Sequence, residues 1–134
     1  MEGIVIDTNV FVAAGFNPRS ASARVLAATR DGRFRLIWNT STRRETEMIL
    51  MRIPRLDWER FADLFQPEGE FTGPVDPYAF VLIADPDDRK FAALSAAVNS
   101  PLVTNDNDLL AARNVTGIDA LTPRGFLARG GRNT

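Results

Sequence analysis

Short, mostly apolar runs recur along the chain, and each is followed closely by a polar turn or a helix-cap signal. Runs of four or five such residues, bounded in this way, are typical of strands buried on both faces of a sheet. The pattern predicts five strands, at residues 3–6, 34–38, 80–84, 101–104 and 118–122.

Apolar residues with helical spacing lie between these runs. Residues 39–42 offer several N-caps for a helix that runs to about Arg52, and Pro54 closes it. The other predicted helices are residues 23–30, 57–65, 87–98, 108–113 and 123–129. Residues 66–77 are rich in Pro and Gly and are predicted to form a loop.

Strands that alternate with helices predict a parallel sheet covered by helices on both faces. We therefore expect an α/β protein with three α/β/α layers and a central sheet of four to five parallel strands. The length of 134 residues suits a single domain spanning residues 1–134. In such sheets ligands bind beyond the carboxyl ends of the strands, so the functional residues should be sought at that edge.

The chain contains neither His nor Cys. Their absence excludes Ser-His-Asp and Cys-His catalysis, His-ligated zinc, disulfides and thiolate metal sites. The remaining chemical groups are carboxylates, hydroxyls, amides, Arg side chains and Lys90, and oxygen ligands favour hard cations such as Mg²⁺ or Mn²⁺. No apolar run approaches the roughly 20 residues needed to span a bilayer, so we expect a cytoplasmic protein.

The net charge of −1 hides an uneven distribution along the chain. Residues 57–88 carry nine acids against a single arginine, Arg60, whereas basic residues outnumber acids on both sides of this segment. A locally positive surface is therefore compatible with a nearly neutral protein.

Acidic residues follow three of the predicted strands. They are Asp7 after residues 3–6, Asp85, Asp87 and Asp88 after residues 80–84, and Asp106 and Asp108 after residues 101–104. The carboxyl ends of parallel strands meet at one edge of a sheet, so we expect these acids to lie together. Glu45, one turn into the helix that starts from the same edge, would join them, whereas Glu47 would point elsewhere.

Helix capping is the alternative explanation for each of these acids. Asp85-Pro86-Asp87 has the pattern of an N-cap followed by the first helical turn, and the other acids also precede helical segments or loops. Capping does not explain Glu45, which lies beyond the first turn. Four carboxylates in one cleft would repel one another unless a cation lay among them, so the set as a whole indicates a metal site.

Four segments in this order resemble the PIN-domain ribonucleases, in particular the bacterial VapC-like branch that includes toxins of toxin–antitoxin pairs. They are "IVIDTNVFVAA", Glu45 on the second predicted helix, "DPDDRKFAALSAA" and "LVTNDNDLL", and "LTPRGFL" matches the usual ending. The resemblance covers about residues 3–127. It implies a PIN-like fold and a ribonuclease that depends on Mg²⁺ or Mn²⁺.

Matched position by position, the resemblance implies an acidic ligand set. The ligands would be Asp7, Glu45, Asp88 and Asp106, with Asp108 as an auxiliary acid. Thr8, Asn9 and Thr104 would orient carboxylates or bound water, although local backbone capping explains Thr8 equally well. The sequence departs from the family where Arg43 and Arg44 replace apolar residues. This departure leaves the choice between Glu45 and Glu47 open; we favour Glu45 because Met48 and Ile49 share its helical face.

The resemblance also implies the partners of the protein. The substrate would be single-stranded or looped RNA, a cognate antitoxin would block the acidic cleft, and two copies would form a homodimer. The side chains that we expect to contact RNA phosphates are Arg19, Arg43, Arg44 and Lys90.

Two alternative functions fit parts of the sequence. A phosphatase or phosphotransferase with Asp7 as its nucleophile would need a second acid two residues later, where this chain has Asn9. A catalytically inert PIN-like binding module would keep the sheet without the activity, but all four ligand positions are still acidic.

Overall fold

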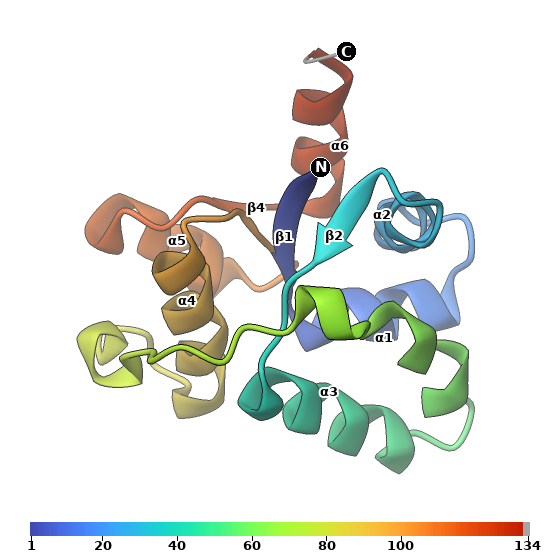
Figure 1. Cartoon of the computed structure of the whole chain (residues 1–134), viewed down its shortest axis with the longest axis horizontal. Coiled ribbons are helices and arrows are strands. Elements are labelled where there is room, and N and C mark those ends of the chain that lie inside the picture. Colours follow the sequence, from blue (N-terminus) through green and yellow to red (C-terminus); the bar gives the residue numbers. More distant parts are fainter. Residues whose placement is uncertain (133–134) are drawn as a thin grey trace.

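A four-stranded parallel sheet forms the centre of the protein in the computed structural model, which describes residues 1–132 (Figure 1). The strands are β1 (Glu2–Ile6), β2 (Phe34–Leu36), β3 (Leu102–Val103) and β4 (Ala120–Leu121). Their order is β2-β1-β3-β4, and all neighbours are parallel. The predicted three-layer α/β/α fold is confirmed, with four strands in its sheet.

Six α-helices surround the sheet within the described residues. They are α1 (Thr8–Phe16), α2 (Ala21–Arg30), α3 (Thr40–Arg52), α4 (Pro86–Val98), α5 (Asn107–Thr116) and α6 (Pro123–Arg132). Four short 3-10 helices connect α3 to α4: η1 (Trp58–Arg60), η2 (Ala62–Leu64), η3 (Pro67–Gly69) and η4 (Pro77–Phe80). None of the helices in residues 1–132 combines the length and the apolar character needed to cross a membrane.

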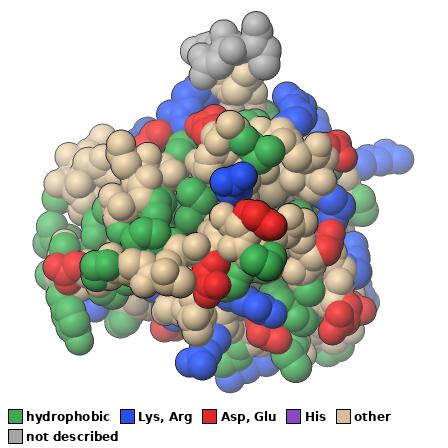
Figure 2. Space-filling model, in the orientation of Figure 1, with side chains coloured by type: hydrophobic (Ala, Val, Ile, Leu, Met, Phe, Trp, Pro, Cys, Tyr) green, Lys and Arg blue, Asp and Glu red, His purple; other side chains and the backbone are tan. Residues whose placement is uncertain are grey.

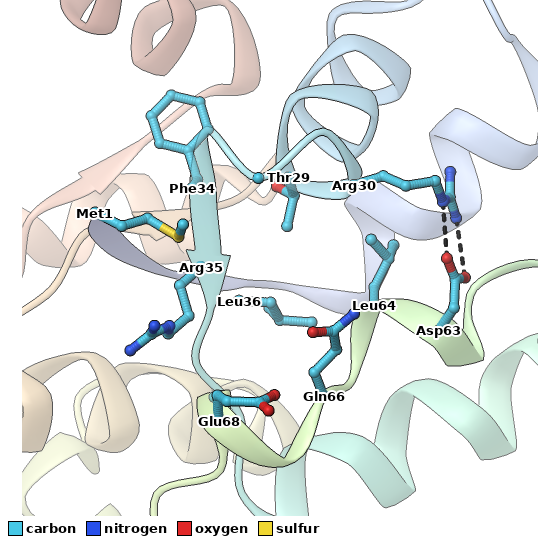
Figure 3. Close-up of a pocket in the computed structure, with 12 residues that line it drawn as sticks. Met1, Thr29, Arg30, Phe34, Arg35, Leu36, Asp63, Leu64, Gln66 and Glu68 are labelled. Carbon is cyan, nitrogen blue, oxygen red and sulfur yellow. Dashed lines mark hydrogen bonds and ion pairs between the residues drawn. The ribbon is translucent and has the colours of Figure 1, made fainter.

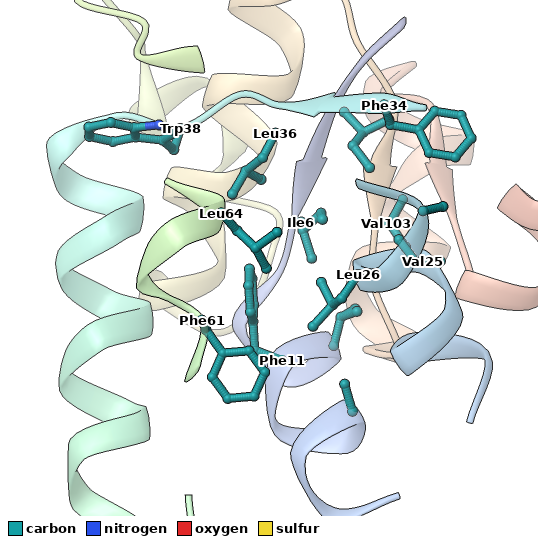
Figure 4. Close-up of a cluster of buried hydrophobic side chains, with 14 of the residues drawn as sticks. Ile6, Phe11, Val25, Leu26, Phe34, Leu36, Trp38, Phe61, Leu64 and Val103 are labelled. Atoms are coloured by element: carbon teal, nitrogen blue, oxygen red, sulfur yellow. The ribbon is translucent and has the colours of Figure 1, made fainter. Parts of the chain in front are cut away.

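Alternate residues of β1 belong to two separate hydrophobic cores, as side chains on a buried strand must. Ile4 and Ile6 pack in a core with residues of α1, α2 and α6, whereas Val5 packs in a core with residues of α4 and α5. Figure 4 shows the first core, where Phe11 lies beside Phe61 with their ring centroids 5.9 Å apart. The two cores hold the strands in place, so the loops at their carboxyl ends have fixed starting points.

The predicted helix at residues 57–65 is wrong in type, because this segment forms the two 3-10 helices η1 and η2. The buried residues Trp58, Phe61 and Leu64 are spaced three apart. A 3-10 helix has three residues per turn, so side chains three apart lie directly above one another, as suits these three residues of η1, η2 and the residue between them.

The predicted strand at residues 80–84 is also wrong. This segment forms the end of η4 and a series of turns, with Phe80 and Ile83 buried but Val81 and Leu82 57% and 73% exposed. The backbone is held by Arg89, whose Nε donates to the Ile83 carbonyl at 2.9 Å. The acids at residues 85–88 therefore reach the sheet edge at the start of α4 and not at the end of a strand.

Helix α1 follows β1 directly, where the hydrophobic pattern predicts no element. Nearly every residue from Val10 to Phe16 is apolar or small, so neither helical nor strand periodicity is visible in the sequence. The helix packs against both α2 and α3.

In the view of Figure 2, hydrophobic side chains gather on the left of the surface, whereas Lys and Arg side chains line its upper, right and lower rims.

Candidate active site

Asp7 occupies the end of β1 and is only 4% exposed. It stands at the N-cap position of α1, yet its side chain makes no capping hydrogen bond. Its Oδ2 instead accepts a hydrogen bond of 2.7 Å from Thr104 Oγ1. Capping therefore does not account for Asp7, and its carboxylate faces the loop that follows β3.

Thr104 connects Asp7 with Asp106. While its hydroxyl donates to Asp7, the same oxygen accepts from the Asp106 backbone N–H at 2.9 Å. Asp106 caps α5 through Oδ1, which accepts from the backbone N–H groups of Asp108 at 2.7 Å and Leu109 at 3.3 Å. The alternative of capping is thus correct for Asp106, and the cap fixes its carboxylate beside Asp7.

The acids that begin α4 have different roles. Asp85 is the N-cap, and its Oδ1 accepts from the Asp87 backbone N–H at 3.0 Å. Asp88, one residue after Asp87, lies close enough to Asp106 for the two carboxyl groups to act on each other electrostatically. Burial and the charges of Asp106 and Asp7 raise the pKa of Asp88 to about 7.

Glu45 reaches the same place from α3 and is 8% exposed. Its Oε1 pairs with Lys90 Nζ at 3.2 Å, and its charge contributes to a raised pKa of Asp7. Of the two residues that supported the choice of Glu45, Met48 is 43% exposed and Ile49 is half-buried, so they do not hold this face inward as a pair. The other buried residues of α3 are Thr42, Thr46 and Leu50. Glu47 is half-buried on the same helix, and the charges that chiefly raise the pKa values of Asp7 and Asp88 come from other acids.

The pKa of Asp7 rises from its usual 3.8 to about 6. Burial is the largest cause, and the negative charges of Asp106 and Glu45 add to it, while hydrogen bonds from Thr104 and the Thr8 backbone oppose it. Asp7, Glu45, Asp88 and Asp106 therefore act on one another electrostatically, and we call these four side chains the acid edge. Asp108 is exposed and lines a separate hollow with Leu82 and Val115.

The residues expected to support the acids differ in what they contact. Thr104 bonds Asp7 as expected, but Thr8 Oγ1 bonds Thr46 Oγ1 at 2.8 Å and joins α1 to α3. Asn9 Oδ1 accepts from the Asn105 backbone N–H at 3.1 Å, which ties α1 to the loop that carries Asp106. Asn9 thus has a structural partner at the position where a phosphatase of the type considered above needs an acid.

Sequence reasoning missed a second hydrogen bond that holds the loop preceding Asp106. The Asn105 side-chain Nδ2 donates to Ser22 Oγ at 3.1 Å, and Ser22 is buried in α2. The two residues are 83 positions apart, and Ser22 lies in a stretch rich in possible helix caps, so no local signal distinguishes it.

The four basic residues predicted to contact phosphate lie in different surroundings. Lys90 forms an ion pair with Glu45 of the acid edge, whereas Arg19 and Arg44 are exposed. The Arg43 guanidinium lies 5.6 Å from the ring of Trp38 and 5.7 Å from that of Trp58. These cation–π contacts explain how an arginine occupies a position that is usually apolar in the resembling family.

Among residues 1–132, no three acidic side chains are placed so that they could hold one metal ion. The chemistry of the acid edge nevertheless suits a hard divalent cation. Its donors are all carboxylate oxygens, one of them is almost completely buried, and their mutual repulsion is of the kind that a cation relieves. We therefore treat Mg²⁺ or Mn²⁺ as compatible with the donor set.

Comparison with known proteins identifies the family of the chain. A search among curated proteins finds no match. The model of one protein family, described as "PIN domain", matches residues 3–108, a range that includes the whole acid edge. Because the match covers most of the 134 residues, the chain belongs to the PIN-domain family, whose members are generally nucleases.

Proposed function

We propose that the protein is a metal-dependent endoribonuclease and that the acid edge is its active site. The observation that carries the proposal is the state of Asp7, a carboxylate buried at a strand end, without a cationic partner in the described residues and beside the charges of Asp106 and Glu45. Burying an unpaired carboxylate reduces the stability of the folded protein. Such a residue is therefore typical of a functional site and not of a structural role.

Each member of the acid edge has a distinct contribution in this proposal. Asp7 and Asp106 are held in place through Thr104, so they supply the fixed ligands, with Asp88 and Glu45 completing the set. When bound, Mg²⁺ or Mn²⁺ activates water and neutralises charge on the phosphate that is attacked. Lys90 holds the carboxylate of Glu45 in position and places a positive charge beside the incoming phosphate.

The proposal is tested by cleavage of a labelled single-stranded RNA in the presence of Mn²⁺ or Mg²⁺, with EDTA as the metal-free reference. Asp7→Asn and Asp88→Asn should each lower the cleavage rate at least 100-fold, because each removes a charged ligand. Asp87→Asn is the matched control: Asp87 precedes Asp88 in the same helical turn but is exposed, and its substitution should leave the rate within about threefold. Circular dichroism would verify that the variants are folded.

If Asp7→Asn cleaves RNA as fast as the parent, the acid edge is not the active site. Calorimetry with Mn²⁺ addresses the alternative of an inert binding module. A parent protein that neither binds Mn²⁺ at millimolar concentration nor cleaves RNA would be such a module, and the proposed function would be wrong.

The finer role that we propose follows from the resemblance to VapC-like proteins. The protein would act in the cytoplasm as the toxin of a toxin–antitoxin pair, as a homodimer, with an antitoxin that covers the acid edge. Expression of the parent should then arrest growth of the host cells, whereas expression of Asp7→Asn should not. Growth at the same rate with both proteins would contradict a toxin role without affecting the nuclease proposal.

A further inference from the structure

A groove of about 580 Å³ lies between α2 and α6, and none of the four acids of the acid edge lines it. Three arginines line it: Arg24 from α2, Arg33 from the turn after α2, and Arg124 from α6. Its floor includes the small side chains of Ala27 and Ala128. We call this feature the arginine groove.

The charge of the arginine groove is largely uncompensated. The ion pairs within the described residues join Arg30 to Asp63, Lys90 to Glu45 and Arg129 to Asp119, and none of them uses an arginine of the groove. Asp31 is the one acid among the lining residues. In the view of Figure 2, Lys and Arg side chains lie along the upper and right rims of the surface, where α6 and α2 are found in Figure 1.

One end of the groove lies next to the acid edge. Ser22, two residues before Arg24, accepts the hydrogen bond from Asn105, which immediately precedes Asp106. The Thr104 backbone N–H bonds the Leu121 carbonyl at 2.9 Å, and Arg124 follows three residues later in the first turn of α6. Arg24 and Arg124 therefore stand in the first turns of two helices that both begin at the carboxyl edge of the sheet, where the helix dipoles add positive potential.

We propose that the arginine groove binds the phosphate backbone of single-stranded RNA on one side of the cleavage point, an inference that rests on the proposed nuclease function. Guanidinium groups match phosphate oxygens in geometry and charge. Arg24 lies six residues before Arg30, the last residue of α2, a span of about 9 Å at the helical rise, and Arg33 lies in the turn just beyond that end. The groove can thus contact more than one phosphate of a strand that leaves the acid edge.

The lining of the groove indicates that it does not recognise the bases of RNA. Its residues include no aromatic side chain on which a base could stack. Alanine and leucine side chains also offer no hydrogen bonds to base edges. The groove should therefore add affinity that depends on salt and is independent of base sequence. Under the proposed nuclease function RNA is the anion that is brought to the acid edge, so a groove beside that edge favours RNA over an acidic peptide.

The test uses the full chain with Asp7→Asn, so that RNA is bound without being cut. The probe is a fluorescein-labelled 12-nucleotide oligo(U) RNA, measured by fluorescence anisotropy between 50 and 400 mM NaCl. The double variant Arg24→Ala/Arg124→Ala should raise Kd about 25-fold at 100 mM salt and reduce the slope of log Kd against log salt by about 1.4. Both values follow from an exponent of about 0.7 for each lost contact with a single strand.

The matched control is Arg52→Ala/Arg55→Ala, which removes the same charge from two exposed arginines outside the groove. It should change Kd by less than about threefold. Equal losses for the two double variants would overturn the proposal, because affinity would then follow net charge alone. An oligo(A) probe should show the same dependence on the groove; a loss confined to oligo(U) would contradict binding through the backbone.

A labelled poly-glutamate peptide provides the other comparison. If the groove variant weakens binding of this peptide but not of RNA, the groove serves an acidic protein and the proposal is wrong. Failure of the proposed function gives a different result: a parent that binds oligo(U) through the groove but never cleaves RNA retains the groove assignment and loses the nuclease.

Discussion

The two ends of the sheet differ in how they arrange charge. Beside the amino ends of β1 and β2, a pocket of about 220 Å³ is bordered by Arg30 and Asp63, whose side chains point toward each other (Figure 3). Arg30 Nε and Asp63 Oδ2 are 3.0 Å apart, and both side chains are largely exposed. This hydrogen bond lowers the pKa of Asp63 and raises that of Arg30, so each group stabilises the charge of the other.

The acid edge, at the carboxyl ends of the strands, has the opposite arrangement. Like charges are gathered there, Asp7 is buried, and the pKa values of Asp7 and Asp88 are raised. Such a cluster makes the folded state less stable at neutral pH, whereas an exposed ion pair stabilises it slightly. The protein therefore retains at one end an arrangement that folding alone disfavours, which is expected of a functional site.

The largest effect that we expect is a change of stability with pH that depends on Asp7. Because its pKa is about 6 in the folded protein and 3.8 in the unfolded chain, the folded state binds more protons between these values. The free energy of unfolding should therefore fall as pH rises from about 4 to 7, by about 3 kcal/mol from Asp7. Urea denaturation in EDTA at several pH values would measure this fall. Asp7→Asn should remove the part that is due to Asp7, whereas Asp88, whose pKa is raised to about 7, should still lower the stability over the same range.

Addition of Mn²⁺ sharpens the same prediction. An ion that binds the ionised carboxylates stabilises only the folded protein, so the parent should gain stability at pH 8 while Asp7→Asn gains little. Asp63→Asn serves as the control and should retain the slope of the parent between pH 5 and 7. A parent whose stability does not change across this range, or whose slope is undiminished in Asp7→Asn, would contradict the electrostatic description of the acid edge.

The next effect in size concerns the Thr104 hydroxyl. Thr104→Val preserves the shape of the side chain but removes the hydrogen bond to Asp7 and the acceptor for the Asp106 N–H. We expect a loss of 10- to 100-fold in cleavage rate and Mn²⁺ affinity, as for other residues that orient metal ligands. Kinetics and calorimetry would measure both quantities.

Thr104→Ser separates orientation from packing in that experiment. Serine keeps the hydroxyl but loses the methyl group, so it should retain most of the activity even if the protein becomes less stable. If Thr104→Val and Thr104→Ser are equally impaired, the hydroxyl has no special role at the acid edge.

Much of the fold and part of the acid edge could be predicted because their signals are local. An apolar run that ends in Asp7 or precedes Asp106 is visible within ten residues, and so is the N-cap at Asn39, whose Oδ1 accepts from the Thr42 N–H at 2.9 Å. Asp88 was predicted to lie at this edge, but for a wrong local reason, since residues 80–84 form no strand. Its helix begins at the edge all the same.

The remainder depends on contacts between distant residues. The sequence contains no signal that Lys90 pairs with Glu45, 45 residues away. Arg43 looked like a departure from the family, and only its contacts with the rings of Trp38 and Trp58 show how it packs. The arginine groove combines residues 24, 33 and 124, which are isolated charges in the sequence. Such sets become visible only when the helices are placed.

The smallest effect that we expect lies at the Arg30–Asp63 pair, and it tests whether the contrast between the two ends is real. A double-mutant cycle with Arg30→Ala and Asp63→Ala should give a coupling of less than about 1 kcal/mol, because both side chains are largely exposed. Arg30 also donates to the Arg60 carbonyl at 2.9 Å, a bond that the cycle separates from the pair. The coupling should weaken as salt is added.

Because the pKa of Asp63 is lowered, the stabilisation that its ionised carboxylate contributes is present above the ordinary value of 3.8 and is lost only in more acidic solution. A coupling above about 2 kcal/mol, or one that changes between pH 5 and 7, would mean that charges at both ends of the sheet contribute comparably to folding. The cost of the acid edge would then no longer distinguish it as the functional end.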